Sequence, residues 1–213
     1  MLDSRRNVLL ACALSALAGY VDGIGFLHLG GLFVSFMSGN STRMGVSLAE
    51  GRWPEAMSAL GLIALFVAGA AGGSLIMQRR DPSVQSLLLM AEGALLVAAT
   101  LCHLMQVPFG AVAAIVLAMG LENAAFQIKS SGGLGLTYVT GALVKVGQGL
   151  AIAVTGGPRL GWLLNLLLWA ALVAGSVLGA WAYLQAGLTV VWAGACFALL
   201  LAFLVAAGAG PEH

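Results

Sequence analysis

The sequence predicts an all-α integral membrane protein with six transmembrane helices, two glycine-rich broken or re-entrant elements, and an inverted three-plus-three internal repeat. Of its 213 residues, 61% are hydrophobic and 8% are charged, whereas a soluble domain carries about 25% charged residues. One transmembrane helix needs about 20 apolar residues, so the chain has room for six. The formal net charge of +1 gives no basic surface for nucleic acid. The composition therefore favours a protein whose main partner is the lipid bilayer.

Six long apolar segments follow one another along the chain. They are Asn7–Leu29, Pro54–Gln78, Val84–Met105, Pro108–Gln127, Arg159–Gln185 and Gly187–Ala207. Proline stands at or just before the start of four of them, where its missing N–H breaks no helix hydrogen bond. We expect each segment to form one transmembrane helix.

The first segment follows two arginines and resembles a twin-arginine export signal. Arg5 and Arg6 precede Asn7 and a leucine-rich run. A cleaved leader has a short apolar stretch followed by a soluble domain, but here the apolar stretch continues past Asp22 and further apolar segments follow. We therefore expect the first helix to remain in the mature protein, with both arginines on the cytoplasmic side.

Two stretches, residues 31–50 and 132–155, do not fit the six-helix scheme, and they resemble each other. Each is rich in glycine and has a basic residue in its middle. Residues 35–45 align with 137–147, residues 17–26 with 117–126, and residues 67–73 with 173–179. The second of these alignments places Asp22 opposite Glu122. Three blocks in the same order predict two copies of one unit, residues 1–105 and 106–213, which together form one membrane domain.

The positions of the basic residues predict the orientation of the chain. If both glycine-rich stretches enter the membrane without crossing it, each unit has three spans and the second unit is inverted. Six bases then lie on the cytoplasmic side and Arg52 outside, as the positive-inside rule favours: Arg5, Arg6, Arg79, Arg80, Lys129 and Arg159. If both stretches cross, the repeats are parallel and three of these bases move outside. We therefore expect a multi-pass membrane protein with both termini in the cytoplasm.

Three carboxylates lie within the predicted helices. Asp22 and Glu122 lie deep in the first and fourth, and Glu92 lies near the middle of the third. A charge at a helix centre costs about 2.5–3.5 kcal/mol on insertion scales. These residues either make buried structural contacts, such as an ion pair or hydrogen bonds to freed backbone groups, or they belong to a pathway for a solute, ion or proton.

The glycine-rich stretches carry the other candidate groups. Arg43 and Lys145 occupy matching places, and a helix that begins near Gly39 or Gly141 would present unpaired N–H groups at the bilayer midplane. Secondary transporters build substrate sites from such half-helices, although a packed hairpin without a ligand is the alternative. The candidate substrate-binding or coupling residues are Asp22, Ser38, Gly39, Asn40, Ser41, Thr42, Arg43, Glu92, Glu122, Asn123, Thr140, Gly141 and Lys145.

Paired motifs resemble one known family. The runs 18–26 (AGYVDGIGF) and 33–41 (FVSFMSGNS), with 119–124 (MGLENA) and 137–141 (TYVTG), are similar to the YoaK family, domain of unknown function 1275. The resemblance covers nearly the whole chain. It implies a small bacterial inner-membrane protein with six helices, supplies no substrate, and implies Gln in many members at the position of Glu122. Asp22 and the run 38–40 are therefore the stronger candidates.

The sequence favours a secondary transporter or channel for a small polar solute, with an anion as one candidate, over two alternatives. No ATP-binding, zinc-protease, nucleophile-elbow or dinucleotide motif is present in the 213 residues, so we expect neither an enzyme nor a cofactor or metal. The main alternative is a non-transporting assembly or regulatory component whose buried charges are structural. An intramembrane enzyme is the third possibility, and a homo-oligomer is left open.

Overall fold

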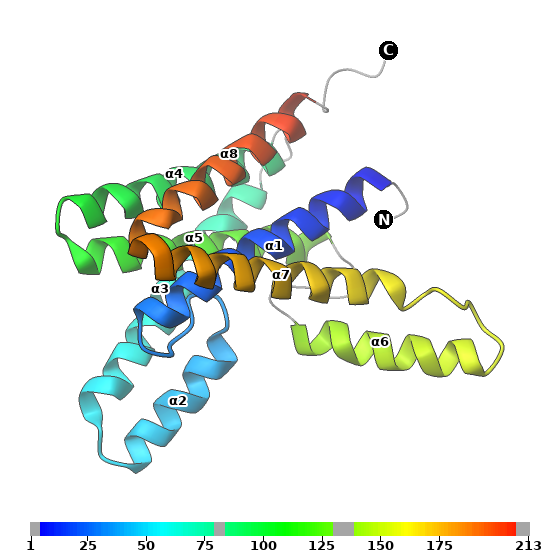
Figure 1. The fold of residues 1–213 in the computed structure, drawn as a ribbon, viewed down its shortest axis with the longest axis horizontal. Coiled ribbons are helices and arrows are strands. Elements are labelled where there is room, and N and C mark those ends of the chain that lie inside the picture. Colours follow the sequence, from blue (N-terminus) through cyan, green and yellow to red (C-terminus); the bar gives the residue numbers. More distant parts are fainter. Residues whose placement is uncertain (1–4, 79–83, 130–138, 208–213) are drawn as a thin grey trace.

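The computed structural model describes residues 5–78, 84–129 and 139–207, and the elements of these ranges are all helical. In chain order they are α1 (Arg5–His28), α2 (Met37–Ala49), α3 (Trp53–Met77), α4 (Val84–Leu104), α5 (Pro108–Lys129), α6 (Val139–Val154), α7 (Leu163–Ala186), the short 3₁₀-helix η1 (Gly187–Val190) and α8 (Val191–Ala207). The six long helices α1, α3, α4, α5, α7 and α8 match the six predicted apolar segments. Figure 1 shows their arrangement.

The two glycine-rich stretches each contain a shorter helix. In the first, a loop of residues 29–36 follows α1 and leads into α2. In the second, α6 begins at Val139, and residues 132–138 lie outside the described ranges. Both α2 and α6 begin near the centre of the molecule, from which α2 runs to the lower left and α6 to the right (Figure 1). The helix starts predicted near Gly39 and Gly141 are thus each within two residues of the observed starts.

By length and composition, four helical segments of the described ranges could cross a membrane: Val8–His28, Trp53–Met77, Val84–Leu104 and Leu163–Ala207. The last is an apolar run of 45 residues that contains both α7 and α8. Gly187 separates these two helices, with φ 65° and ψ −152°, a conformation that is open almost only to glycine. The chain therefore turns sharply after α7.

Large apolar side chains cover the outside of the molecule. Val67, Trp181 and Phe203 keep 59%, 62% and 69% of their surface exposed. Contiguous exposed apolar surface of this kind is unfavourable in water and matches lipid tails. The exposed faces therefore support a protein embedded in a bilayer.

Close backbone contacts join α1 to α7. A Cβ atom placed on Gly175 would lie 2.0 Å from the carbonyl oxygen of Ala16, and one placed on Gly19 would lie 2.1 Å from that of Leu172. The hydroxyl of Ser176 also donates a hydrogen bond of 3.1 Å to the carbonyl of Gly19. Small residues permit this approach, which is a common basis of helix packing in membranes.

The same kind of contact joins α3 to α5. A Cβ atom on Gly69 would lie 2.3 Å from the carbonyl oxygen of Leu117, and one on Gly120 would lie 2.2 Å from that of Phe66. The packing is therefore reciprocal: α1, the first helix of one predicted repeat, lies against α7, and α5, the first helix of the other predicted repeat, lies against α3. In Figure 1, α1 and α7 accordingly lie side by side although they are far apart in the sequence.

This reciprocity corrects the alignment of the first helices of the two repeats. Gly19 of α1 lies against Leu172 of α7, and Gly120 of α5 lies against Phe66 of α3. Leu172 comes 106 positions after Phe66, which is the predicted offset between α3 and α7, whereas Gly120 comes 101 positions after Gly19. The predicted offset of 100 between α1 and α5 is therefore wrong by one residue. Asp22 matches Asn123, and Glu122 matches Val21, so the two carboxylates do not occupy equivalent places.

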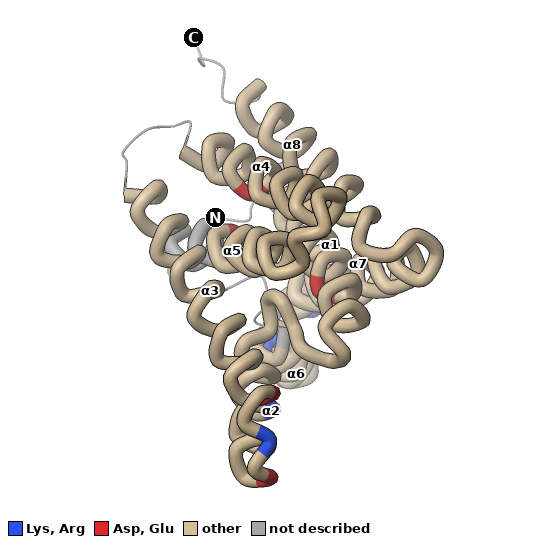
Figure 2. Tube along the Cα trace, turned by 90° about the vertical axis from the view of Figure 1, so that its left-hand side faces the viewer, with Lys and Arg blue, Asp and Glu red and all other residues tan. Residues whose placement is uncertain are grey.

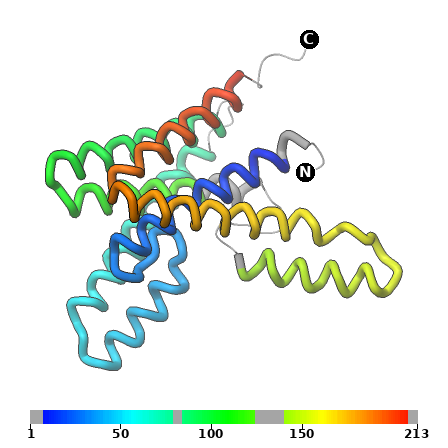
Figure 3. Tube along the Cα trace, viewed as in Figure 1, coloured from blue at the N-terminus to red at the C-terminus, as the bar shows by residue number. Residues whose placement is uncertain are grey.

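The helix contacts also fix relative directions. The two contacts of Gly19 and Gly23 with Leu172 and Ser176 advance together along both helices, so α1 and α7 run parallel. Between α4 and α8 the direction is opposite, because Ser86 near the start of α4 bonds the carbonyl of Ala202 near the end of α8. Figure 3 shows α4 and α8 side by side with opposite colour gradients.

The close contacts predict which glycines tolerate a methyl group. Gly175→Ala and Gly120→Ala should each lower the free energy of unfolding by about 1–3 kcal/mol, the usual cost of overpacking. Gly72→Ala, on the same α3 helix as Gly69 but with no atom within 4 Å of its added Cβ, is the control and should be neutral or stabilising. Thermal unfolding of the detergent-purified variants measures this. Equal melting temperatures for all three variants would refute the packing described.

Candidate functional site

Asp22 of α1 holds the 29–36 loop. Its Oδ1 accepts hydrogen bonds from the backbone N–H groups of Val34 (3.0 Å) and Ser35 (2.9 Å), and its Oδ2 accepts one from the Ser35 hydroxyl (2.5 Å). A carboxylate that accepts several N–H and O–H groups is stabilised without a base. Asp22 therefore satisfies loop backbone groups in the way the structural alternative for a buried carboxylate predicts.

Asn40 of α2 holds the same loop from the other side. Its side-chain oxygen accepts the N–H of Phe33 (2.8 Å), and its amide nitrogen donates to the carbonyl of Phe33 (2.7 Å). Asn40 has no exposed surface. Both backbone groups of one loop residue are thus paired with a single buried side chain.

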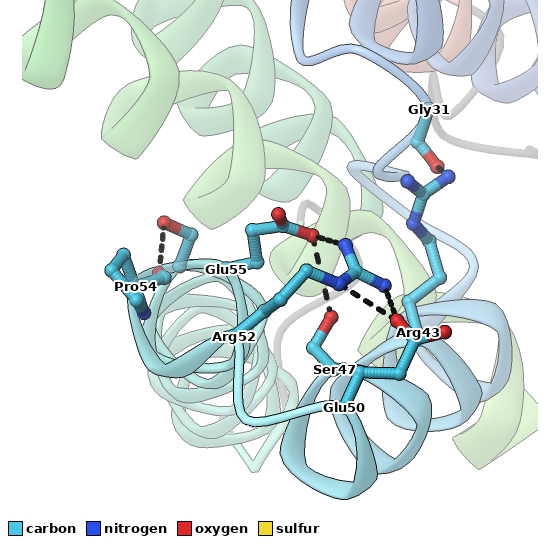
Figure 4. A network of polar contacts seen from close by, with 8 residues as sticks. Gly31, Arg43, Ser47, Glu50, Arg52, Pro54 and Glu55 are labelled. Atoms are coloured by element: carbon cyan, nitrogen blue, oxygen red, sulfur yellow. Dashed lines mark hydrogen bonds and ion pairs between the residues drawn. The ribbon is translucent and has the colours of Figure 1, made fainter.

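Arg43 does not form an ion pair with Asp22, Glu92 or Glu122, although an ion pair was one of the contacts considered for a buried carboxylate. Its guanidinium donates a 2.8 Å hydrogen bond to the carbonyl oxygen of Gly31, as Figure 4 shows. The φ of Gly31 is 97°, and an added Cβ there would lie 2.4 Å from the Arg43 guanidinium. Arg43 is therefore a third side chain that closes the 29–36 loop.

The remaining candidates of α2 do not converge on one point. The hydroxyls of Ser41 and Thr42 bond the carbonyls of Met37 and Ser38 four residues earlier in the chain, and both side chains are exposed. Ser38 is also exposed. Gly39 lies against aromatic rings, because an added Cβ would lie 2.8 Å from Phe33 and from Phe36. The run 38–42 therefore supplies loop packing and surface hydroxyls.

In the second glycine-rich stretch, the described candidates lie on α6. Thr140 is exposed, while Gly141 and Lys145 are half-buried. Within the described ranges neither Thr140 nor Lys145 makes a hydrogen bond or ion pair. Thr137 falls outside those ranges. Asn123 of α5, which matches Asp22, is buried and donates 2.9 Å to the carbonyl of Met119.

Glu92 of α4 and Glu122 of α5 form the most unusual feature of the interior. Both side chains have no exposed surface, and their four carboxyl oxygens have no hydrogen-bond partner among the described residues. The two helices form an antiparallel hairpin in which Gly110 lies against Cys102. If the same pairing of positions continues along the hairpin, Glu92 lies opposite residue 120, which is within one helical turn of Glu122. We call these two residues the carboxyl pair.

The surroundings of the carboxyl pair are acidic or apolar. Glu122 interacts electrostatically with Glu92 and with Asp22, and no basic group of the described ranges acts on it. Figure 2 shows acidic positions among the helices near α4, α5 and α1, away from the charges at the far end of α2. In those ranges, no three His, Cys, Asp or Glu side chains lie close enough to hold a metal ion. The pair therefore offers sites for protons or for hydrogen-bond donors.

A second polar cluster lies at the exposed turn between α2 and α3 and was not predicted from the sequence. Arg52 bonds Glu50 and Glu55, and the hydroxyl of Ser47 reaches Glu55 at 3.5 Å (Figure 4). The hydrogen bonding of Arg52, whose guanidinium donates to the carboxylate of Glu50, is the main cause that raises the pKa of Arg52. Because exposed ion pairs contribute little stability, this cluster orients the turn more than it stabilises the fold.

Comparison with known proteins places the chain in a family. It matches the family described as "Protein of unknown function (DUF1275)" over residues 10–204. The chain belongs to the DUF1275 family. A UPF0700 transmembrane protein of Rhizobium meliloti (strain 1021) is 36% identical over 192 residues, which cover 90% of this chain and 83% of that protein. No solved structure matches. The resemblance seen in the paired motifs is thus confirmed, and this DUF1275 chain is a multi-pass membrane protein.

The closeness of Glu92 and Glu122 in this DUF1275 protein could have been found from one signal in the sequence. Only residues 105–107 separate α4 from α5, and so short a connection favours an antiparallel hairpin. Counting outward from that turn places the two glutamates at nearly the same depth. The role of Asp22 left no comparable signal, because its partners lie 12 and 13 residues away in a loop.

The bonds of Asn40 predict a stability difference between neighbours in α2. Asn40→Ala should destabilise this DUF1275 protein by about 1–3 kcal/mol, because it leaves the N–H and C=O of Phe33 buried without partners. Ser41→Ala is the matched control and should stay within about 0.5 kcal/mol, since its hydroxyl is exposed and bonds its own helix. Thermal unfolding in detergent compares them. Equal losses would show that Asn40 does not hold the loop.

Proposed function

We propose that this protein is a secondary transporter or channel for a small polar solute, with six spans and a path between two broken elements. The observation that carries the proposal is a pair of buried carboxyls without partners, in a chain whose short helices α2 and α6 begin near its centre. Ionisable residues inside a membrane protein mark solute, ion or proton pathways more often than any other role.

The helix directions support six spans. If α2 and α6 both crossed the membrane, the alternation of directions along the chain would make α4 and α8 parallel. Instead they are antiparallel, since Ser86 bonds Ala202. The parallel directions of α1 and α7 further indicate that α2 and α6 either both cross the membrane or both do not. Both therefore fit re-entrant elements that enter and leave on one side.

The contact between α4 and α8 supports an inverted repeat. An added Cβ on Gly93 would lie 2.7 Å from the side chain of Leu199, and these positions are related by the same offset of 106 that relates α3 to α7. Residues that a twofold axis exchanges can touch each other only at that axis. An axis between α4 and α8, in the membrane plane, would invert the second repeat and direct α6 to the opposite side from α2.

The inverted topology also sets the orientation that we propose. Six basic positions fall on one side, and Arg52 lies on the other, at the α2–α3 turn. The positive-inside rule then puts both termini in the cytoplasm, in keeping with a bacterial inner membrane.

The proposed solute is a polar molecule without a strong negative charge. An anion would need Arg43 and Lys145 at the site, but Arg43 already bonds the carbonyl of Gly31. The groups that remain without partners in the interior are acidic. A neutral or cationic solute fits these groups better than the anion that the sequence left as one candidate.

One observation favours the second candidate, a non-transporting assembly or regulatory component. Asp22, Asn40 and Arg43 all bond the backbone of the 29–36 loop. Three of the site candidates therefore already have a structural role. In that case the two broken elements form a packed unit and need no solute.

The six-span topology predicts opposite exposure of two loops. In a variant without native cysteines, Glu50→Cys should react with a membrane-impermeant maleimide added to intact cells, because the α2–α3 turn lies outside. Gly157→Cys, in the α6–α7 loop, should react only after permeabilisation. Labelling of both sites from the same side would support eight spans and refute the inverted arrangement.

The transport proposal predicts a ligand that binds the folded protein. A thermal-stability screen of the detergent-purified protein against sugars, amino acids, polyols, amines and inorganic ions across pH should find one. A ligand at 100 times its Kd stabilises the folded state by about 2.7 kcal/mol. Flux of that ligand into reconstituted vesicles should fall in Glu92→Gln and persist in Glu50→Gln, an exposed control.

A flat screen, together with unchanged stability of Glu92→Gln and Glu122→Gln and a loss of stability in Asp22→Asn, would favour the assembly component instead. A binding solute whose flux is the same in empty and protein-containing vesicles would likewise contradict transport.

A further inference from the structure

We propose that the carboxyl pair, Glu92 and Glu122, is a single proton-binding site inside the membrane that holds at least one proton at neutral pH. The idea that this proton couples to solute transport rests on the function proposed above. As a proton-binding site it rests only on burial and on the groups around it.

The geometry of the pair carries the inference. All four carboxyl oxygens are buried and none has a hydrogen-bond partner in the described part of the chain. An ionised carboxylate needs a cation or several donors when it leaves water, and two neighbouring carboxylates repel each other besides. With neither a cation nor donors present, both groups cannot be ionised together. A proton on at least one of them removes the conflict.

Among the side chains that the structure describes, no base near the pair offers another solution. The element α1 contributes Asp22, which is itself acidic. The titratable residues of α8 and α3 are Cys196, which is exposed, and Glu55, which lies in the first turn of α3 beside Arg52. In α4, His103 lies in the last turn, three turns from Glu92, and η1 has no titratable residue.

A proton fits the pair better than a metal cation does. Hard metal cations such as Ca²⁺ and Mg²⁺ take about six or more oxygen ligands, and helix carbonyls are already engaged in the helices. The described residues bring no third acidic, histidine or cysteine side chain within metal-binding reach of the pair. A proton needs only one carboxyl oxygen, with the second carboxyl as acceptor.

The pair also differs from Asp22 and has no copy in the other half. Asp22 has three donors, all from the 29–36 loop. The offsets of the repeat place Val21 at the position of Glu122 and Ala198 at that of Glu92. Among the described residues, the pair is therefore present once, on the α4–α5 hairpin that joins the two halves.

Infrared spectroscopy of the full-length protein in lipid nanodiscs tests the inference without any solute. At neutral pH the wild type should show the carbonyl band of a protonated carboxyl, which disappears when Glu92→Gln and Glu122→Gln are combined. Glu50→Gln and Glu55→Gln, both at exposed carboxylates, should leave the band unchanged.

Three results would overturn the proposal. They are the absence of the band in the wild type at neutral pH, a band of full size in the folded double variant, and loss of the band when sodium chloride replaces choline chloride at constant pH. If the double variant does not fold, the single variants Glu92→Gln and Glu122→Gln provide the test. Each leaves one carboxyl beside an amide, which should shift the carbonyl band. An unshifted band in both single variants would contradict the proposal that the two carboxyls form one site.

The test separates the two proposals. A band that behaves as expected, in a protein that carries no solute, leaves the proton site intact and refutes transport. A solute flux that depends on the protein, without the band, supports transport and refutes the proton site.

Discussion

The inability of lipid tails to form hydrogen bonds is the constraint on which this structure depends. Helices satisfy their own backbone groups, but the 29–36 loop cannot, and non-helical backbone inside a membrane is tolerated only where protein or a cavity provides partners. Asp22, Asn40 and Arg43 provide them, with bonds to Ser35, Phe33 and Gly31. These polar residues therefore allow a chain break to exist within an apolar molecule. The carboxyl pair differs from these residues, because its oxygens bond no backbone group of the described residues.

Close backbone approach is the second condition, and it determines which helices are neighbours. Lipid gives helices no hydrophobic reason to associate, so packing depends on small residues and shape. Glycines on α1, α3, α5 and α7 let backbones meet where side chains would keep them apart. The result joins the two halves of the chain through α1 with α7 and α3 with α5, while α4 packs antiparallel to α8. The carboxyl pair lies on α4 and α5, and Gly93, next to Glu92, packs against Leu199 of α8.

Much of the fold was predictable from the sequence, because lipid imposes long apolar runs and glycine marks their interruptions. The six long helices and the starts of α2 and α6 fall within a few residues of expectation. The repeat register was off by one because it paired acid with acid, Asp22 with Glu122, whereas packing pairs Gly19 with Gly120. The candidate site was harder, since the partners of Asp22 and Arg43 are backbone atoms that no motif reveals. Glu92 and Glu122 were both identified as candidates, but their closeness was not, although the short α4–α5 connection places them at nearly the same depth.

The packing of α1 against α7 constrains the order in which the protein can assemble during synthesis. During synthesis α1 emerges first, yet its main packing partner, α7, appears only after about 160 further residues. Until then its glycine face, with Gly19 and Gly23, lies in lipid without a complementary surface. The first half of the chain is thus unable to complete this packing by itself, and assembly must be completed late, when α7 arrives.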